Sequence, residues 1–172
     1  VGNVKENAKA PGGYEVVPEN FEILSLSDPI LPVETSDHTK TDIDKRLEWR
    51  FLDTRRKNIS RIFKVRSKIF KHTVNFFESQ KFVNINTPKT TRLGLEGGAT
   101  LFNLMYFGKS AYLAQSPQLY KQMFVVGGFE KVYEIGPVFR AEKSHTTRHI
   151  AEFTGIDMEM GFINDENDVM DV

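Results

Sequence analysis

The stretch FRAEKSHTTRHIAEFTGIDMEM, residues 139–160, gathers side chains that could do chemistry. Its ionisable groups alternate with aromatic and aliphatic residues, and they include Arg140, Glu142, Arg148, His149, Glu152, Asp157 and Glu159. An arginine fork can bind a phosphate or a carboxylate through two parallel hydrogen bonds. A flat phenyl ring can stack on a base, and a carboxylate can accept a hydrogen bond from an exocyclic amine. These residue types are therefore the parts of an ATP-binding site.

The spacing of the residues predicts that they share one surface. Arg140 and Glu142 lie two apart at the end of an expected strand. His149, Phe153 and Asp157 recur every four residues on the expected returning strand. Side chains an even number of residues apart on a strand point to the same face. The two strands would present one concave polar surface with Phe153 in its middle.

An ion-paired hairpin is the alternative interpretation of this stretch. Its two arginines would neutralise Glu142 and Glu152, and Phe153 would belong to the core. Cross-strand charge pairs of this kind are ordinary. Two common nucleotide-binding signatures, G-x-x-x-x-G-K-[ST] and a strand-linked G-x-G-x-x-G, do not occur. The stretch alone leaves both interpretations open.

The composition limits the kind of protein. The 172 residues, 40% of them hydrophobic, suffice for one domain, or for one domain and part of another, around a buried core. Because 23 basic residues balance 23 acidic ones, a polyanionic partner would have to be held by a local patch. The absence of cysteine excludes disulfides, thiolate zinc sites and cysteine nucleophiles. No stretch approaches the roughly 20 apolar residues of a membrane span, so we expect a cytoplasmic location and no membrane partner.

The apolar pattern predicts an α+β domain built on an antiparallel sheet flanked by helices. An amphipathic helix is expected over residues 57–80, where apolar residues recur at spacings of three, four and seven. A strand follows, in which Val83, Ile85 and Thr87 share one side and Pro88 marks an edge or an end. Strand-like runs around a Gly108–Lys109 turn, a second helix and two further strands are expected at 100–107, 111–114, 116–126, 131–139 and 151–162.

We divide the chain into three parts. Residues 1–27 contain a Pro-Gly-Gly turn and short runs rich in valine and aromatic residues, which are typical of a hairpin or of terminal strands. Residues 28–45 hold two prolines and no helical periodicity, as expected of a linker. Residues 46–172 form the α+β domain.

Four segments resemble, in order, the class II aminoacyl-tRNA synthetases. FRAEKSHTTRHIAEFTGID is similar to motif 2 of that family, and KFVNINTPKTT resembles motif 1, with Lys81 where a glycine is common. LEGGATLF is similar to the mobile loop, and AQSPQLYKQM to the amino-acid-binding helix, of aspartyl-tRNA synthetases of the archaeal and eukaryotic type. This resemblance runs from about Arg46 to the last residue. Residues 1–27 resemble the last strands of the OB-fold anticodon-binding domain, with an unrelated hairpin as the alternative.

The resemblance implies activation of L-aspartate by ATP to aspartyl-adenylate, followed by transfer to the 3′ end of tRNA-Asp. Arg140 would be the catalytic residue, because it would bridge the α-phosphate and the attacking carboxylate. That carboxylate is already ionised, so no general base is needed. The implied ATP-binding residues are Arg140, Ala141, Glu142, Arg148, His149, Ile150 and Phe153. The implied aspartate-binding residues are Glu96, Ser116, Gln118, Leu119, Tyr120, Lys121, Arg140 and Asp157.

Amino-acid choice depends on Lys121 in this interpretation. Gln118 and Lys121 are three apart on the expected helix and so share a face. A cation there suits the side-chain carboxylate of aspartate, whereas asparagine would leave it unpaired. In the mobile loop, Leu95 stands where serine or threonine is common. An asparaginyl-tRNA synthetase and an asparagine synthetase-like paralogue are the alternatives within the enzymes.

Cofactors and partners follow from the same resemblance. ATP, Mg²⁺, L-aspartate and tRNA-Asp are expected, and the helix at 57–80 is expected to form a homodimer. No metal ligand is expected within this chain, and the third family motif, a glycine-rich segment ending in an arginine, does not occur in it. A non-catalytic dimerisation or tRNA-binding fragment is therefore a further alternative. We expect the chain alone to be inactive and to bind ATP with a dissociation constant of about 1 mM or poorer.

Overall fold

The computed structural model describes residues 1–10, 12–36, 40–92, 101–142, 146 and 149–172. The chain divides into two compact units, Val1–Lys64 and Val65–Val172, called here the N-terminal and C-terminal units. The division falls inside the long helix α3 (Lys57–Ser79).

The N-terminal unit begins with an antiparallel hairpin of β1 (Gly2–Glu6) and β2 (Tyr14–Pro18). Every residue of both strands is exposed, and Val4 and Val16 are cross-strand partners. The predicted hairpin is thus present, although β1 precedes the Pro-Gly-Gly turn and the apolar run at 21–26 forms no strand. A two-stranded ribbon buries too little surface to be stable alone. The boundary predicted at residues 28–45 stays a prediction.

Two short helices, α1 (Ile43–Glu48) and α2 (Arg50–Asp53), precede α3. They end at Asp53, whose carboxylate is fully buried among arginines of the same unit. Arg46 Nε donates to Oδ1 at 2.9 Å, Arg50 Nη1 donates to Oδ2 at 2.6 Å, and Arg56 Nη1 lies 3.8 Å from Oδ1. The hydrogen bond from Arg46 is the largest influence on the pKa of Asp53, which it lowers against the opposing effect of burial. This cluster therefore fastens α1 and α2 to the start of α3.

We expect the stability of the protein to fall as the pH drops below about 4. Because the folded pKa of Asp53 lies below its unfolded value, its stabilising contribution is present above the unfolded pKa and is lost as the pH falls through the folded pKa. Urea denaturation at a series of pH values measures this loss. Asp53→Asn should be less stable than the unmodified protein at neutral pH and should lose less stability in acid. Equal acid dependence of the two proteins would contradict the prediction.

Helix α3 confirms the helix predicted at 57–80 and ends one residue earlier. Its last turn ends in a Schellman motif: Phe82 N donates to Phe77 O at 2.9 Å, and Lys81 N donates to Glu78 O at 3.0 Å. The rings of Phe77 and Phe82 meet edge to face at 5.1 Å, which is the hydrophobic contact that accompanies this type of helix end. Lys81 takes the left-handed conformation that the motif requires, with φ at 65°. Glycine is the residue that adopts this conformation most readily.

Lys81→Gly is expected to stabilise the protein by about 0.5 to 1 kcal/mol. A residue with a Cβ atom in the left-handed conformation is strained by roughly 1 to 2 kcal/mol, and glycine removes this strain. Part of the gain is offset because glycine increases the conformational entropy of the unfolded chain. Lys71→Gly, on the exposed surface of the same helix, is the matched control and should destabilise by about 1 kcal/mol. Chemical denaturation of both variants measures the difference. Loss of stability in Lys81→Gly would show that the left-handed conformation carries no strain.

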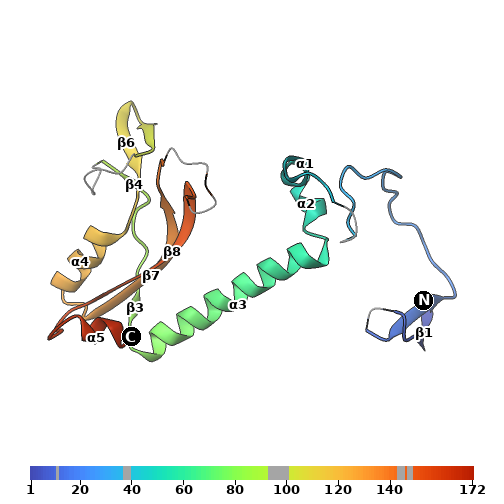
Figure 1. The fold of residues 1–172 in the computed structure, drawn as a ribbon, viewed down its shortest axis with the longest axis horizontal. Helices are drawn as coiled ribbons and strands as arrows, with labels where there is room; N and C mark the ends of the chain where they lie inside the picture. The colour runs from blue at the N-terminus through green and yellow to red at the C-terminus, as the bar shows by residue number, and fades with distance from the viewer. Residues whose placement is uncertain (11, 37–39, 93–100, 143–145, 147–148) are drawn as a thin grey trace. The chain divides into compact units, whose positions relative to one another are not determined.

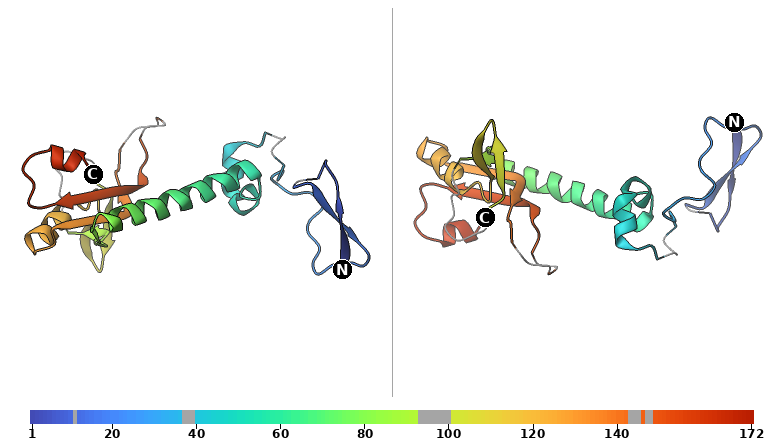
Figure 2. Two further views of the ribbon diagram at one scale, coloured as in Figure 1. Left: turned by 90° about the horizontal axis from the view of Figure 1, so that it is seen from below. Right: turned by 90° about the horizontal axis from the view of Figure 1, so that it is seen from above.

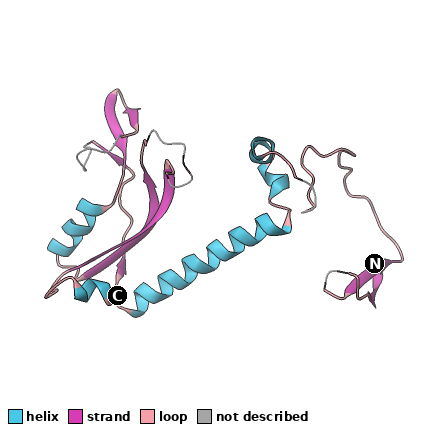
Figure 3. Cartoon of the chain, in the orientation of Figure 1, coloured by secondary structure: helices cyan, strands magenta, loops and turns pink. Residues whose placement is uncertain are grey.

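The C-terminal unit holds two three-stranded sheets (Figure 1). The first has the order β3 (Val83–Asn84), β7 (Lys131–Phe139), β8 (Glu152–Met160); β3 is parallel to β7, and β7 and β8 are antiparallel from Lys131↔Met160 to Phe139↔Glu152. Strands β7 and β8 run side by side in every view of Figure 2. The second sheet has the antiparallel order β4 (Thr90–Thr91), β6 (Lys109–Leu113), β5 (Asn103–Tyr106). Helices α4 (Gln118–Val126) and α5 (Asn167–Met170) complete the unit (Figure 3).

The predicted α+β class is confirmed, with local differences. Ile85 and Thr87 are buried, whereas Val83, predicted on the same side, is exposed. The turn between β5 and β6 consists of Phe107 and Gly108, one residue earlier than expected, and both have positive φ. Two consecutive residues of positive φ match the right-handed twist of a hairpin.

Strand β7 has two different faces. On one face Tyr133 stacks on Phe77 at 4.7 Å, and this pair forms the core of the unit together with Phe82. The other face carries the alternate residues Glu134, Gly136 and Val138, and Arg140 follows it beyond the end of the strand. The sheet therefore packs its Tyr133 face against the end of α3, and its other face places Glu134 and Arg140 beside buried valines.

Candidate nucleotide and amino-acid site

Predicted nucleotide-binding residues gather at the end of the β7–β8 pair. A hollow of about 480 Å³ is lined by Arg140, Glu142, His149, Ile150 and Phe153. The guanidinium carbon of Arg140 lies 5.6 Å from the ring centre of Phe153, and its backbone N donates to Ala151 O at 2.9 Å. Ala141, predicted with them, is half-buried between Arg140 and Glu142.

The ion-paired alternative does not describe Arg140. Among the residues that the structure describes, no carboxylate lies within ion-pairing distance of its guanidinium, and the ring of Phe153 is partly exposed instead of buried in a core. An exposed arginine over an exposed ring has a surface for a planar or anionic ligand.

His149 does not lie on the returning strand, where its spacing had placed it. Strand β8 begins at Glu152, and His149 precedes it, with Nδ1 at 2.6 Å from Thr146 Oγ1. Its Nε2 lies 3.6 Å from Glu142 Oε2, an ion pair only when the ring is protonated. The even spacing of His149 and Phe153 suggested a strand, but pairing with β7 ends at Phe139↔Glu152. Arg148 lies outside the described residues.

Lys121, predicted to bind the amino acid, lies in a cluster of charged side chains. It projects from α4 and is only 4% exposed. Its Nζ donates to Met158 O at 3.0 Å and to Asp157 Oδ1 at 3.3 Å, and it lies 3.6 Å from Glu159 Oε2. Because one cation meets two carboxylates, this cluster has an excess of negative charge. Such a cluster can accept a ligand ammonium while Lys121 faces a ligand carboxylate.

Gln118 reaches the same cluster. Its Nε2 donates to Glu159 Oε2 at 3.4 Å, and Gln118 and Lys121 thus meet the same carboxylate from one face of α4. Ser116 Oγ accepts from Gln118 N at 3.1 Å and so fixes the start of α4. Sequence reasoning did not assign Glu159 to the site, although its spacing of two from Asp157 on β8 was the available signal.

For the other predicted aspartate-binding residues, the structure gives only their exposure or does not describe them. Leu119 is exposed and Tyr120 is half-buried on α4. Glu96 and the neighbouring loop residues Leu95, Gly97 and Gly98 lie outside the described residues.

A pair of glycines separates the two ends of the site. Gly136 on β7 is the register partner of Gly155 on β8, between Val138↔Phe153 and Glu134↔Asp157. Neither glycine covers the polar face with a side chain. Phe153 and Asp157 lie four residues apart, or about 13 Å along the strand. This face is therefore a strip with an aromatic and cationic end, a middle where neither strand has a side chain of its own, and a carboxylate and ammonium end.

The chain belongs to the class II tRNA synthetases of the D, K and N group, because that family matches residues 42–172. An aspartate–tRNA(Asp/Asn) ligase of Methanopyrus kandleri is 49% identical over 99% of this chain and 40% of the relative. An aspartate–tRNA(Asp) ligase of Pyrococcus abyssi is 47% identical over 99% of this chain and 39% of the relative. The chain thus spans about two fifths of the length of these curated relatives.

A solved structure with the same fold is the asparaginyl-tRNA synthetase of Pyrococcus horikoshii complexed with asparaginyl-adenylate. It superposes with a TM-score of 0.86 at 35% identity, over 99% of this chain and 38% of that one. A putative aspartyl-tRNA synthetase of Leishmania major superposes with a TM-score of 0.85 at 32% identity, over 99% of this chain and 35% of that one. These likenesses confirm the predicted class II fold.

Among the described residues, no group of three or more histidine, cysteine, aspartate or glutamate residues is arranged to hold a metal ion. In the same part of the chain, no helix is both long enough and apolar enough to cross a bilayer.

Proposed function

We propose that this protein is an aspartate–tRNA ligase, which activates L-aspartate with ATP and transfers it to tRNA-Asp. The observation that carries the proposal is the strip on β7 and β8, with Arg140 and Phe153 at one end and Lys121 at the other. Its extent suits an extended aminoacyl-adenylate, and the similar Pyrococcus horikoshii structure is complexed with such a molecule. Curated relatives at 46% to 51% identity are aspartate–tRNA ligases.

Each end of the strip has a defined task in this proposal. Arg140 bridges the α-phosphate and the attacking carboxylate, which relieves the repulsion between two anions as the new bond forms. Phe153 stacks on the adenine, and Glu142 accepts a hydrogen bond from its amino group. His149 and Arg148 bind the outer phosphates; Arg148 lies outside the described residues.

At the amino-acid end, different residues bind the charged groups of aspartate. Lys121 pairs with the side-chain carboxylate, while Asp157 and Glu159 hold the substrate ammonium. Glu96, outside the described residues, is proposed to assist them. Asparagine would leave the buried ammonium of Lys121 without its ligand partner, which disfavours asparagine.

Family members use ATP, and Mg²⁺ is proposed as its companion ion. The described residues offer no cluster of three or more histidine, cysteine, aspartate or glutamate side chains for the metal. A cytoplasmic location likewise stays a prediction.

The test is ATP–pyrophosphate exchange by the full-length protein with aspartate or asparagine as the amino acid. Aspartate-dependent exchange supports the proposal. Exchange that depends on asparagine would favour an asparaginyl-tRNA synthetase, the second candidate, which the likeness to the Pyrococcus horikoshii enzyme supports. Exchange with neither amino acid would favour a non-catalytic module.

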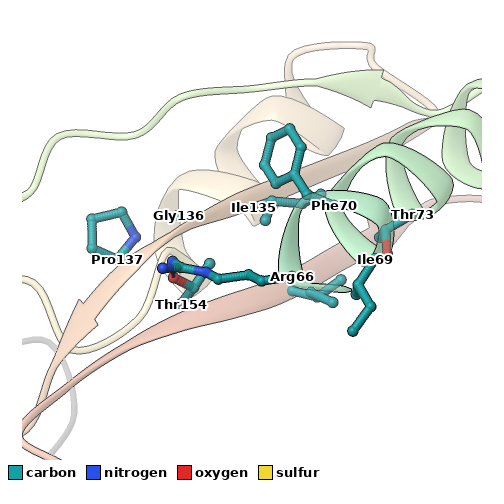
Figure 4. Close-up of a pocket in the computed structure, with 9 residues that line it drawn as sticks. Arg66, Ile69, Phe70, Thr73, Ile135, Gly136, Pro137 and Thr154 are labelled. Atoms are coloured by element: carbon teal, nitrogen blue, oxygen red, sulfur yellow. Dashed lines mark hydrogen bonds between the residues drawn. The ribbon is translucent and has the colours of Figure 1, made fainter. Parts of the chain in front are cut away.

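A homodimer is also proposed, from the apolar surface of the C-terminal unit. Ile69 and Phe70 of α3 are more than half exposed. They line a hollow of about 400 Å³ with Ile135, Pro137 and Ile156, and Figure 4 shows Arg66 extending across it to Thr154, to which it donates at 2.9 Å. Exposed apolar surface of this kind marks interfaces, and two-fold dimers are the commonest assembly. A monomer by analytical ultracentrifugation at micromolar concentration would refute the dimer.

A further inference from the structure

Glu134 is a buried carboxylate to which the proposed mechanism gives no task. It is 2% exposed, and on the polar face of the sheet it is the register partner of Asp157. Its Oε1 accepts from Thr87 N at 3.0 Å, and its Oε2 accepts from Thr87 Oγ1 at 2.7 Å. A charge so deeply buried requires a partner of opposite sign.

Lys89 is that partner. Its Nζ donates to Glu134 Oε1 at 2.8 Å and to Thr87 Oγ1 at 3.1 Å. The side chain of Lys89 is 25% exposed, so its ammonium lies at the boundary between the buried carboxylate and the open face. An ammonium has three N–H donors, and two of them are used by these contacts. The third has no acceptor among the described residues.

The ammonium of Lys89 lies close to Gly136 on the polar face of β7. A Cβ atom built on Gly136 would meet Lys89 Nζ at 3.3 Å and Glu134 Oε1 at 3.2 Å. The ammonium of Lys89 thus lies over Gly136, in the middle of the strip between Phe153 and Asp157. In an extended adenylate, the middle is where the carboxylate and the α-phosphate are joined.

Lys89 is also tied to both ends of the site through its backbone. Its carbonyl accepts from Ala114 N at 3.0 Å, and Ala114 O accepts from Phe139 N at 3.0 Å. Ala114 lies just before the segment that carries Ser116 and Lys121, and Phe139 precedes Arg140. These bonds hold the backbone of Lys89 next to the segments that carry both ends of the site, and the contacts with Glu134 and Thr87 hold its ammonium.

We propose that Lys89 is a further catalytic residue of the activation reaction, which contacts the anionic junction between carboxylate and α-phosphate, and that Glu134 is the positioning residue that holds it there. This inference rests on the proposed function. The bond that forms joins a carboxylate oxygen to the α-phosphorus, and the bond that breaks releases pyrophosphate. Lys89 transfers no proton; it stabilises the negative charge that both reactants bring to the middle of the strip.

The test compares three variants of the full-length protein in ATP–pyrophosphate exchange with aspartate. Lys89→Met should lower kcat at least tenfold, because the stabilising charge is lost where the reaction occurs. It should also lower the melting temperature, because Glu134 is left buried without its cation. Lys89→Arg keeps a cation and should recover part of kcat.

The double variant Lys89→Met, Glu134→Gln separates catalysis from folding. It removes both charges, and the glutamine oxygen can still accept from Thr87, so the melting temperature should recover relative to Lys89→Met. If Lys89 contacts the reacting groups, kcat of the double variant stays at least tenfold below the unmodified value, with the KM values for ATP and aspartate within about threefold.

Recovery of kcat together with the melting temperature would overturn the inference, because the pair would then serve the fold alone. In that case the unmodified protein would still perform aspartate-dependent exchange, and the proposed function would stand. Absence of exchange in the unmodified protein would overturn the proposed function and this inference with it.

Discussion

Arg140→Gln is expected to lower kcat for aspartate-dependent pyrophosphate exchange by about 100- to 1000-fold. That range is typical for removal of one preorganised donor from a transition state with developing charge. Glutamine keeps a planar polar group but loses the positive charge and the fork that can bind two oxygens at once. The guanidinium over Phe153 has no carboxylate partner among the described residues, so no buried acid is left behind by the substitution. The effect should therefore appear in catalysis and not in stability.

Two further variants make this result specific. Arg140→Lys keeps the positive charge but lacks the fork, so its kcat should lie between those of Arg140→Gln and the unmodified protein. Lys109→Gln removes an exposed cation from β6, outside the proposed site, and should leave exchange unchanged. If Arg140→Gln retained kcat within threefold of the unmodified protein, Arg140 could not be the group that bridges the two anions.

The elements that carry the site could be predicted from the sequence because their patterns are local. The apolar periodicity of α3 and the apolar runs of β7 and β8 are properties of neighbouring residues, and all three elements lie within a few residues of their predicted bounds. The parallel pairing of β3 with β7 could not be predicted, because it joins segments almost 50 residues apart that no single tight turn connects. The left-handed conformation at Lys81 could not be predicted from the lysine itself. The only signal was the glycine that is common at this position in similar sequences.

The site was predictable in its residue types and less so in its contacts. Even spacing correctly grouped Phe153 and Asp157 on one face, but the same rule misplaced His149, because spacing does not show where a strand begins. The pairing of Lys121 with Asp157 and Glu159 depends on how α4 packs against β8, and the pairing of Lys89 with Glu134 joins segments 45 residues apart in sequence. Such contacts are set by tertiary packing, which a single sequence does not display.

Lys121→Met is expected to reduce kcat/KM for aspartate in pyrophosphate exchange by more than tenfold, with the KM for ATP nearly unchanged. A tenfold loss corresponds to about 1.4 kcal/mol, which lies below the value of a typical charge-assisted hydrogen bond. Methionine has a similar length and no charge, so the ligand carboxylate would lose its cation while the packing of α4 is largely kept. In the proposed function the adenine and the outer phosphates bind at the Phe153 end of the strip, about 13 Å from Asp157 along β8, which is why the KM for ATP should not change.

The structure adds a second consequence to this substitution. Because Lys121 is buried between Asp157 and Glu159, its loss leaves two carboxylates facing each other without a cation, and the melting temperature should fall as well. The double variant Lys121→Met, Glu159→Gln removes one of these charges and should recover stability without recovering aspartate activation. Gln122→Met, on the exposed side of α4, controls for the introduction of methionine and should change neither quantity. Unchanged kcat/KM for aspartate in a folded Lys121→Met protein would refute the assignment of Lys121 as the group that recognises the substrate side chain.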